Sequence, residues 1–525
     1  MPNPAVFENY YEGPAVEPDG DEIWCYSDQP AYSPGETLIL HVSTTAERFD
    51  LEIARDHLEF EIVYEKSNLP GKRHATPADV SVVGCGWPVA CEIEIPLDWP
   101  TGGYRITCRI DTQSGIREQH HLVLIRNKQG NRSSRLALVS STGTWLAYNN
   151  WGGSNHYEGI YGPKANAYAP IVSNQRPLPR GFVVLPEGAP RAALAAKPKP
   201  DEPISYPHME FAYANGYSKK YASAGWASYE RPFVQWAARN GFEVDLISQF
   251  DLQLRPDLVE DYACLAFIGH DEYWSWEMRD TIDSYVENGG RIARFAGNFM
   301  WQTRLEDAGR RQVCYKYIAA SDDPMAGTDR ETTSWEAPQL GRPGSLTFGL
   351  NAIHGVYAGW GGCVAFGSGG FPVYRPEHWA FEGTYLGYGD VLGADSRIFA
   401  YEVDGLDYVI RDGLPFPSET MQVPDDLEIL ALGLASNREI ARGVSADELF
   451  LGADDGNFRA KILYGEVDDE TSAIAGRGSG MIVSFHKGKG EVFHAGSVEW
   501  VAGLIRRDQP VERVTRNVLN RFLLQ

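Results

Sequence analysis

The stretch from Cys264 to Trp301 constrains the fold most, because it places a polar cluster where a short apolar strand is followed by a helix. Cys264 to Ile268 is an apolar run of the length of a buried strand. Four apolar residues then recur at helical spacing: Met278, Ile282, Tyr285 and Val286. Ser275 is positioned to cap this helix and the Gly289–Gly290 pair to end it. Arg291 to Ala296 predicts the next strand, so the segment is expected to form strand, helix, strand.

The polar cluster His270-Asp271-Glu272-Tyr273 follows the first of these strands directly. Ligands of open α/β sheets bind at the carboxyl ends of strands, so these side chains are candidates for metal ligands with a general base. The alternative is a hydrogen-bonded strand end, since polar residues there commonly cap the next helix. The turn carries no thiol or hydroxymethyl group at its tip, which disfavours acyl-enzyme chemistry.

Residues 15–130 are expected to form an all-β domain, a β-sandwich, because short apolar runs alternate with turn signals there. The expected strands are Thr37–Ser43, Asp50–Ile53, Phe60–Tyr64, Val80–Val83, Cys91–Ile95, Tyr104–Ile110 and His121–Ile125. The polar run from Arg126 to Arg132 is a natural linker.

Residues 134–525 are expected to form an α/β domain, a flavodoxin- or glutamine-amidotransferase-like parallel sheet, because strands alternate with helices. The expected elements are strands Arg135–Ser140, Phe242–Ile247, Gly480–Phe485 and Glu491–Ala495, and helices Glu230–Asn240, Asp257–Asp261 and Val511–Leu524. A long stretch rich in Pro, Gly, Tyr and Asn runs to about Ala227, and such stretches are usually functional.

The chain has 525 residues and a net charge of −24, which disfavours nucleic acid and anionic membranes as partners. The N-terminus lacks the basic start and apolar core of a signal peptide, so we expect a cytoplasmic protein. Seven scattered cysteines form no CxxC pair, which argues against a disulfide framework and a cysteine zinc site.

Several segments resemble the family of N,N-dimethylformamidase large (β) subunits and their relatives. These are TWLAYNNWGG (144–153), ERPFVQWAARNGFEVDLIS (230–248), GHDEYWS (269–275), GGRIARFAGN (289–298) and HAGSVEW (494–500) with the C-terminal helix. The resemblance covers roughly residues 135 to 525 and, more loosely, the N-terminal part. It implies an amidotransferase-like α/β domain that hydrolyses a formamide to formate and an amine. It also implies a mononuclear ferric iron held by two tyrosines and one glutamate, a small second subunit and a homo-oligomer.

Carried onto this chain, the resemblance implies Tyr273 and Tyr229 as the tyrosine ligands and Glu331, beside Trp335, as the carboxylate ligand. Glu377 is the alternative carboxylate. Phenolate and carboxylate oxygens are hard donors that suit a ferric ion, which would polarise an amide carbonyl as a Lewis acid.

We expect His270 to act as the general base of this site. The other candidate bases are His354, His378 and His486. Asn298 and Asn150, or Asn149 in place of Asn150, are expected to orient the carbonyl, although each residue type is common in turns.

The sequence thus predicts an iron-dependent enzyme that hydrolyses the C–N bond of a small neutral amide. The alternative is a non-catalytic carbohydrate-binding or scaffold protein whose Trp and Tyr loops stack on sugar rings. A different hydrolase on the same scaffold is a third possibility, because a fold does not determine its chemistry.

Overall fold

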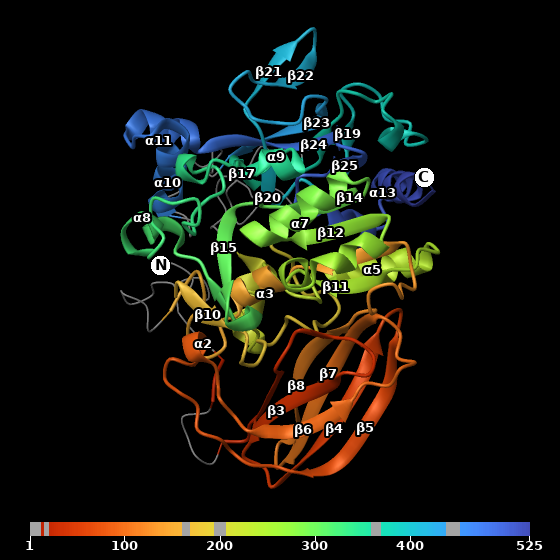
Figure 1. Cartoon of the computed structure of the whole chain (residues 1–525), viewed down its shortest axis with the longest axis vertical. Coiled ribbons are helices and arrows are strands. Elements are labelled where there is room, and N and C mark those ends of the chain that lie inside the picture. Colours follow the sequence, from red (N-terminus) through yellow and green to blue (C-terminus); the bar gives the residue numbers. More distant parts are fainter. Residues whose placement is uncertain are drawn as a thin grey trace.

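The computed structural model has a strand-rich N-terminal region at one end and a mixed α/β region around a large sheet (Figure 1). The structure describes residues 12–14, 20–159, 169–193, 206–358, 369–436 and 452–524. Cys363 and parts of the long stretch before Ala227 lie outside the described residues. Within the described residues, no helix has the length and apolar character needed to cross a membrane.

The N-terminal region contains two sheets. The first has the order β1 (Ile23–Ser27), β3 (Thr37–Thr44), β6 (Val89–Glu94). The second has the order β2 (Ala31–Tyr32), β8 (Gly115–Ile125), β7 (Gly102–Thr112), β4 (Arg48–Asp56), β5 (Phe60–Pro70). Alternate residues of both sheets, such as Leu40 and Ile106, are fully buried in one common core. This alternation is what the sequence pattern predicts for strands with one covered face.

The expected strand at Val80–Val83 is wrong, because this run forms a helical turn, α2 (Val80–Val83). The backbone amides of Val83 and Gly84 donate to the carbonyls of Asp79 and Val80, which satisfies them within the turn. Val80 packs in a small tryptophan-rich cluster, whereas Val83 is more than half exposed. Four residues are too few to show whether apolar side chains recur with the period of a helix or with that of a strand.

The central sheet has seven strands. Their order is β11 (Asp245–Ser248), β9 (Leu136–Ser140), β12 (Cys264–His270), β14 (Arg291–Gly297), β25 (Gly490–His494), β24 (Arg477–Lys487), β23 (Glu428–Ser436). The first five strands pair in parallel, as expected, but β24 pairs antiparallel with both of its neighbours, β25 and β23. The short connection from β24 to β25 turns at Gly488 (φ 59°), which makes these strands a hairpin. The sheet is therefore mixed rather than parallel.

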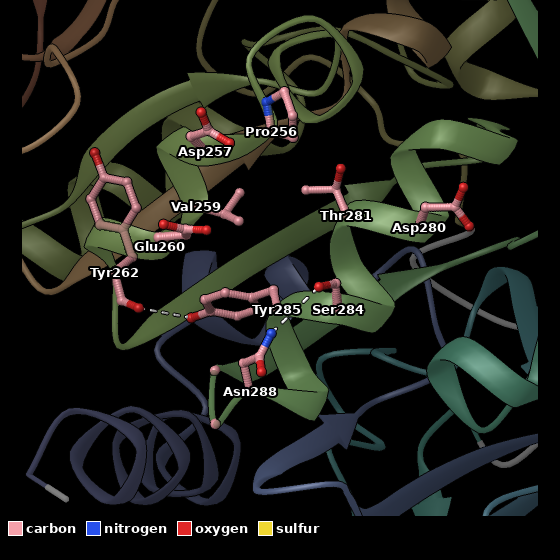
Figure 2. A pocket seen from close by; sticks show the side chains of 12 residues that line it. Pro256, Asp257, Val259, Glu260, Tyr262, Asp280, Thr281, Ser284, Tyr285 and Asn288 are labelled. Atoms are coloured by element: carbon pink, nitrogen blue, oxygen red, sulfur yellow. Dashed lines mark hydrogen bonds between the residues drawn. The ribbon is translucent and has the colours of Figure 1, made fainter.

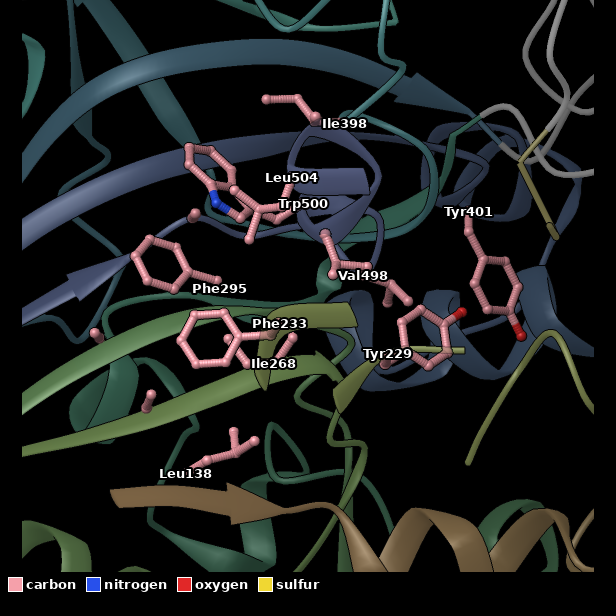
Figure 3. Packing of buried hydrophobic residues seen from close by; sticks show 14 of the residues in the cluster. Leu138, Tyr229, Phe233, Ile268, Phe295, Ile398, Tyr401, Val498, Trp500 and Leu504 are labelled. Carbon is pink, nitrogen blue, oxygen red and sulfur yellow. The ribbon is translucent and has the colours of Figure 1, made fainter. Parts of the chain in front are cut away.

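Two helices that the sequence predicts, and one that it does not, cover one side of the sheet. On one side, Phe233 of α5 (Glu230–Arg239) and Trp500 of α12 (Trp500–Ile505) lie over Ile268 and Phe295 of the sheet (Figure 3). The C-terminal helix α13 (Gln509–Leu524) belongs to the same core.

Helix α7 (Trp276–Glu287) begins and ends as the sequence predicts. The Ser275 hydroxyl accepts a hydrogen bond from the backbone amide of Met278 at 3.2 Å, which caps the first turn. Gly289 follows the helix with φ 114°, a conformation that favours glycine.

The order of strands predicts a crevice at the carboxyl ends of β9 and β12. From β9 the chain first adds β11 on one side and then β12 on the other. The segments that leave β9 and β12, namely α3 (Thr142–Tyr148) and the turn after His270, therefore diverge at the carboxyl edge of the sheet. The place where neighbouring strands connect in opposite directions along the sheet is the usual ligand site of an open α/β sheet.

Candidate active site

The carboxylate of Glu272 lies at the centre of this crevice and is buried. Its Oε2 accepts hydrogen bonds from the hydroxyls of Tyr148 at 3.0 Å and Tyr157 at 2.5 Å. Its Oε1 accepts one from the indole Nε1 of Trp301 at 2.7 Å. The hydroxyl of Tyr273 donates to that of Tyr157 at 2.7 Å. Three phenols and one carboxylate, which we call the phenol cluster, thus form one hydrogen-bonded chain.

Separate elements hold the phenol cluster together. Tyr148 ends α3, and Tyr157 lies in the loop that follows it. Asn155 joins the two, because its amide group donates to the carbonyl of Tyr148 and accepts from the backbone amide of Tyr157. The backbone amide of Glu272 donates to the Thr144 hydroxyl at 2.9 Å, which fixes the turn after β12 against α3.

A second group of polar side chains borders the phenol cluster. His270 Nε2 lies 3.0 Å from Glu402 Oε2 and 3.4 Å from Glu272 Oε2. His270 Nδ1 lies 2.7 Å from the carbonyl oxygen of Ser223, so this nitrogen carries a proton. Asn298 Nδ2 donates to Glu402 Oε2 at 2.9 Å. Glu402 comes from β20 (Tyr401–Gly405), far along the chain from the other members.

Burial and neighbouring carboxylates control the charges in the crevice. Burial lowers the pKa of His270, but Glu402 and Glu272 outweigh it and raise that pKa to about 9. Burial, together with the Glu272 carboxylate, raises the pKa of the hydroxyls of Tyr148, Tyr157 and Tyr273 well above its usual value. The phenols are therefore neutral at neutral pH unless a cation replaces their protons.

Strained backbone surrounds the site. Four non-glycine residues there have positive φ: Asn298 (66°), Lys316 (52°), Val356 (108°) and Tyr401 (66°). Such conformations cost on the order of 1–3 kcal/mol each and concentrate at functional sites, because the surrounding structure must enforce them.

A small cavity of about 40 Å³ opens beside the two glutamates. Its polar wall contains Glu272, Asn298 and Glu402, and its apolar wall includes Met300 and Val356. One water molecule needs about 10–15 Å³ of volume measured in this way, so the cavity has room for a few water molecules. The buried Lys316 places its Nζ 3.4 Å from the ring centroid of Tyr157, which adds positive charge beside the phenol cluster.

Four of the side chains that the sequence singles out lie in this crevice: His270, Glu272, Tyr273 and Asn298. The hydroxyl of Tyr229 instead donates to the carbonyl of Ala222, although its ring packs against Gly269. The carboxylate of Glu331 accepts from the backbone amide of Gly327 at 2.7 Å.

The remaining candidates have partners elsewhere. The Asn150 side chain accepts from the Ser218 hydroxyl, and that of Asn149 donates to the carbonyl of Pro177. His354 pairs with the Asn351 side chain, and His486 with Asp426 on the surface. His378 accepts from the backbone amide of Ala380, and Glu377 is exposed.

Sequence reasoning did not single out Tyr148, Tyr157, Glu402 or Lys316. Tyr148 was within reach, because it follows the first buried strand of the sheet by one short helix, at the same edge as the turn after β12. Tyr157 and Lys316 lie in irregular stretches and Glu402 lies in the short strand β20, and nothing local in the sequence indicates where these segments lie relative to the sheet.

A larger hollow, of about 590 Å³, lies elsewhere (Figure 2). It is lined by residues before the amino ends of β12 and β14, including Asp257, Tyr262, Asp280 and Tyr285. Two of these lining residues are joined, because the hydroxyl of Tyr285 donates to the backbone carbonyl of Tyr262 (Figure 2). Its position at the amino edge of the sheet separates it from the phenol cluster, where the catalytic residue types converge.

Comparison with known proteins decides the family. A family profile described as "N,N-dimethylformamidase beta subunit-like, C-terminal" matches residues 57–512. The chain belongs to this family. Proteins named N,N-dimethylformamidase beta subunit from Alcaligenes sp. and Paracoccus aminophilus are each 24% identical to it, over 324 and 323 residues. These matches cover 55% of this chain and 36% of each relative, so the chain spans about a third of the length of these members of the dimethylformamidase β-subunit-like family.

Proposed function

We propose that the chain hydrolyses the C–N bond of a small neutral amide in the crevice at the carboxyl edge of the sheet, with one iron ion. The convergence of the Tyr148 and Tyr157 hydroxyls on one oxygen of Glu272 carries this proposal. The names of the relatives agree with it.

The phenol cluster has the chemistry that a ferric ion requires. Tyr148, Tyr157 and Glu272 offer oxygen donors only, and a ferric ion prefers such hard ligands. The two phenol oxygens lie within hydrogen-bond distance of Glu272 Oε2, and the phenolic protons occupy the space between these three oxygens. We propose these three residues as the metal ligands, with Tyr273 hydrogen-bonded to Tyr157 beside them. Among the described residues, no cluster of three His, Cys, Asp or Glu side chains offers another such site.

Glu402 is placed to act as the base. When bound, the ion supplies Lewis acidity that polarises the amide carbonyl. Glu402 lines the cavity, whereas both nitrogens of His270 are directed at Ser223 and the carboxylates. Glu402 therefore accepts a proton from the attacking water and passes it to the departing amine nitrogen, while His270 and Asn298 hold the carboxylate in place.

The alternative, a carbohydrate-binding protein, requires exposed aromatic rings. The tryptophans near the crevice, such as Trp151, Trp274 and Trp301, are instead fully buried. This observation favours the amidase proposal.

The test compares two ligand sets by substitution. Protein produced in iron-rich medium is expected to hold about one iron per chain, to show a visible tyrosinate-to-iron band, and to release amine from formamide or N,N-dimethylformamide. Tyr148→Phe, Tyr157→Phe and Glu272→Gln are expected to lose the band and the activity. Tyr229→Phe and Glu331→Gln serve as matched controls and are expected to keep both. A colourless wild-type protein that stays iron-free overturns the proposal.

The relatives are named as beta subunits, and we extend this to propose a small second subunit and a homo-oligomer for this chain. We also propose that the two N-terminal sheets form a β-sandwich and that the central sheet is amidotransferase-like. The core that the two N-terminal sheets share supports the first assignment, and the parallel pairing from β11 to β25 supports the second. Light scattering of the purified chain, alone and after co-expression with candidate subunits, measures the assembly.

A further inference from the structure

Arg294 lies directly beneath the proposed active site and is completely buried. It comes from the middle of β14, between Phe267 of β12 and His494 of β25. Its guanidinium forms a two-pronged pair with the carboxylate of Asp271, with Nε 2.9 Å from Oδ2 and Nη2 on Oδ1. Its Nη1 donates to Asp404 Oδ2 at 2.7 Å and also contacts His494.

Both carboxylate partners of Arg294 lie within two residues of a functional group of the site. Asp271 directly precedes Glu272, the carboxylate of the phenol cluster. Asp404 lies two residues after Glu402 on the same strand. Both aspartates are fully buried, so their positions depend on the pairing rather than on water.

Asp404 extends this link to a third segment. Its Oδ1 accepts a hydrogen bond from the backbone amide of Phe299 at 3.0 Å. That bond fixes the backbone directly after Asn298, which is held in the left-handed region and donates to Glu402. Three segments that are distant in the sequence thus meet on one guanidinium.

We infer that Arg294 is a positioning residue, which sets the separation of Glu272, Asn298 and Glu402 by holding Asp271 and Asp404 on one rigid guanidinium. This inference rests on the proposed function for its catalytic consequence. A planar fork fixes both the distance and the angle between two carboxylates, which a flexible ammonium does not. An error of about 1 Å in such a site costs on the order of a hundredfold in rate.

The test substitutes Arg294→Lys, which keeps the charge and loses the fork. The control is Arg126→Lys, because Arg126 is also a buried arginine between two carboxylates, Glu36 at 3.5 Å and Asp251 at 3.7 Å, in a different part of the chain. Both variants are expected to lose thermal stability. Only Arg294→Lys is expected to lower kcat by about tenfold or more with KM little changed.

Two further readouts separate positioning from general destabilisation. In Arg294→Lys, the tyrosinate-to-iron band is expected to shift or weaken per bound iron. In metal-free Arg294→Lys, hydrogen exchange is expected to accelerate in residues 269–275, 296–302 and 400–405. The control Arg126→Lys is expected to leave both the band and the exchange in these segments unchanged. Asp404→Asn keeps the pair between Arg294 and Asp271, so it is expected to show smaller changes in kcat, in the band and in hydrogen exchange. This variant provides a test if Arg294→Lys does not fold.

If Arg294→Lys and Arg126→Lys differ only in melting temperature, the inference is overturned. If the wild-type protein neither binds iron nor hydrolyses amides, the proposed function has failed. Hydrogen exchange in the metal-free chain then decides the role of Arg294 by itself, since unchanged exchange in the three segments contradicts it and faster exchange supports it.

Discussion

Asn298 shows how a single residue type serves the backbone and the site together. It follows β14 with φ 66°, a conformation that asparagine and glycine tolerate better than other residues. Its side chain then reaches Glu402 Oε2 and His270 Nε2. An asparagine here therefore ends the strand and also supplies an amide group to the crevice.

Replacing Asn298 by Gly and by Ala separates these two roles. Asn298→Gly keeps the left-handed backbone and removes the amide, so activity is expected to fall by about tenfold or more with the melting temperature nearly unchanged. Asn298→Ala removes the same amide and adds about 1 kcal/mol of backbone strain. Amide hydrolysis and thermal unfolding of both variants measure the difference. Wild-type activity in Asn298→Gly would contradict a role for the amide.

At the residue scale, the sequence predicts only the part of the site that is local to one strand end. His270, Tyr273 and Asn298 lie at or just after the carboxyl ends of two neighbouring parallel strands. Recognising those two strands from their apolar pattern is therefore enough to predict that these side chains lie close together. Tyr157 and Glu402 lie in irregular or short elements, and nothing near them in the sequence indicates the sheet edge at which they arrive.

At the scale of single elements, periodicity works where an element is long and buried on one side. It predicts β9, α5, β12, α7, β14 and α13 nearly to their ends. It does not resolve the region from about 305 to 480, where the strands other than β23 are short or lie in small sheets of two to four strands. The sequence predicts β24 and β25 as a pair of strands, but it does not predict the edge strand β23, which pairs with β24.

The cap of α7 provides a test of a predicted element boundary. Ser275→Ala removes the hydroxyl that accepts from Met278 N, and is expected to lower the free energy of unfolding by about 1 kcal/mol. Ser284→Ala is the control, because Ser284 lies on the exposed side of the same helix. Denaturant unfolding of both variants measures the cap, and equal stabilities would contradict it.

Glu230, the first residue of α5, makes stability depend on pH. Its Oε1 accepts from the Ser141 amide and the Trp145 indole, while Oε2 has no hydrogen-bond partner. Burial raises the pKa of this carboxyl to about 8. The folded state therefore holds a proton that the unfolded chain loses near pH 4.3, and the group loses its stabilising effect as pH rises from about 4.3 to 8.

Glu230→Gln is expected to remove this dependence, because the amide oxygen accepts the same two bonds without titrating. The difference in free energy of unfolding between variant and wild type should change by up to about 1.4 kcal/mol per pH unit in that range, in favour of the variant at higher pH. Urea unfolding at several pH values measures it. A constant difference would show that the carboxyl is ionised in the folded state.

At the scale of the whole molecule, the two regions share one core. Leu122 and Leu124 of β8 belong to the same buried cluster as Leu138 and Trp226. The carboxylate of Asp56, in β4, accepts from the indole of Trp226 at 2.7 Å and from Arg231 at 2.8 Å. The proposed boundary near residue 130 therefore separates two sets of secondary-structure elements, but side chains from both sets pack in the same core.

Asp56→Ala tests this shared core. It leaves the buried Trp226 nitrogen without its acceptor and removes the pair with Arg231, so we expect a loss of about 2–4 kcal/mol. The unfolding transition is expected to stay single. Asp50→Ala, on the exposed side of the same strand, is the control. Two separate transitions in calorimetry would show instead that the regions unfold independently.

The convergence of the crevice residues also dictates when the site can form during synthesis. Roughly half of the chain separates Tyr148 from Glu402, and the strand that carries Arg294 pairs with β25, near residue 490. Bringing such distant segments together is entropically costly and slow, because no local contact compensates in advance. Early in synthesis the nascent chain therefore holds the three proposed ligands without the base, and Glu402 is expected to join the crevice only after the later strands have been made.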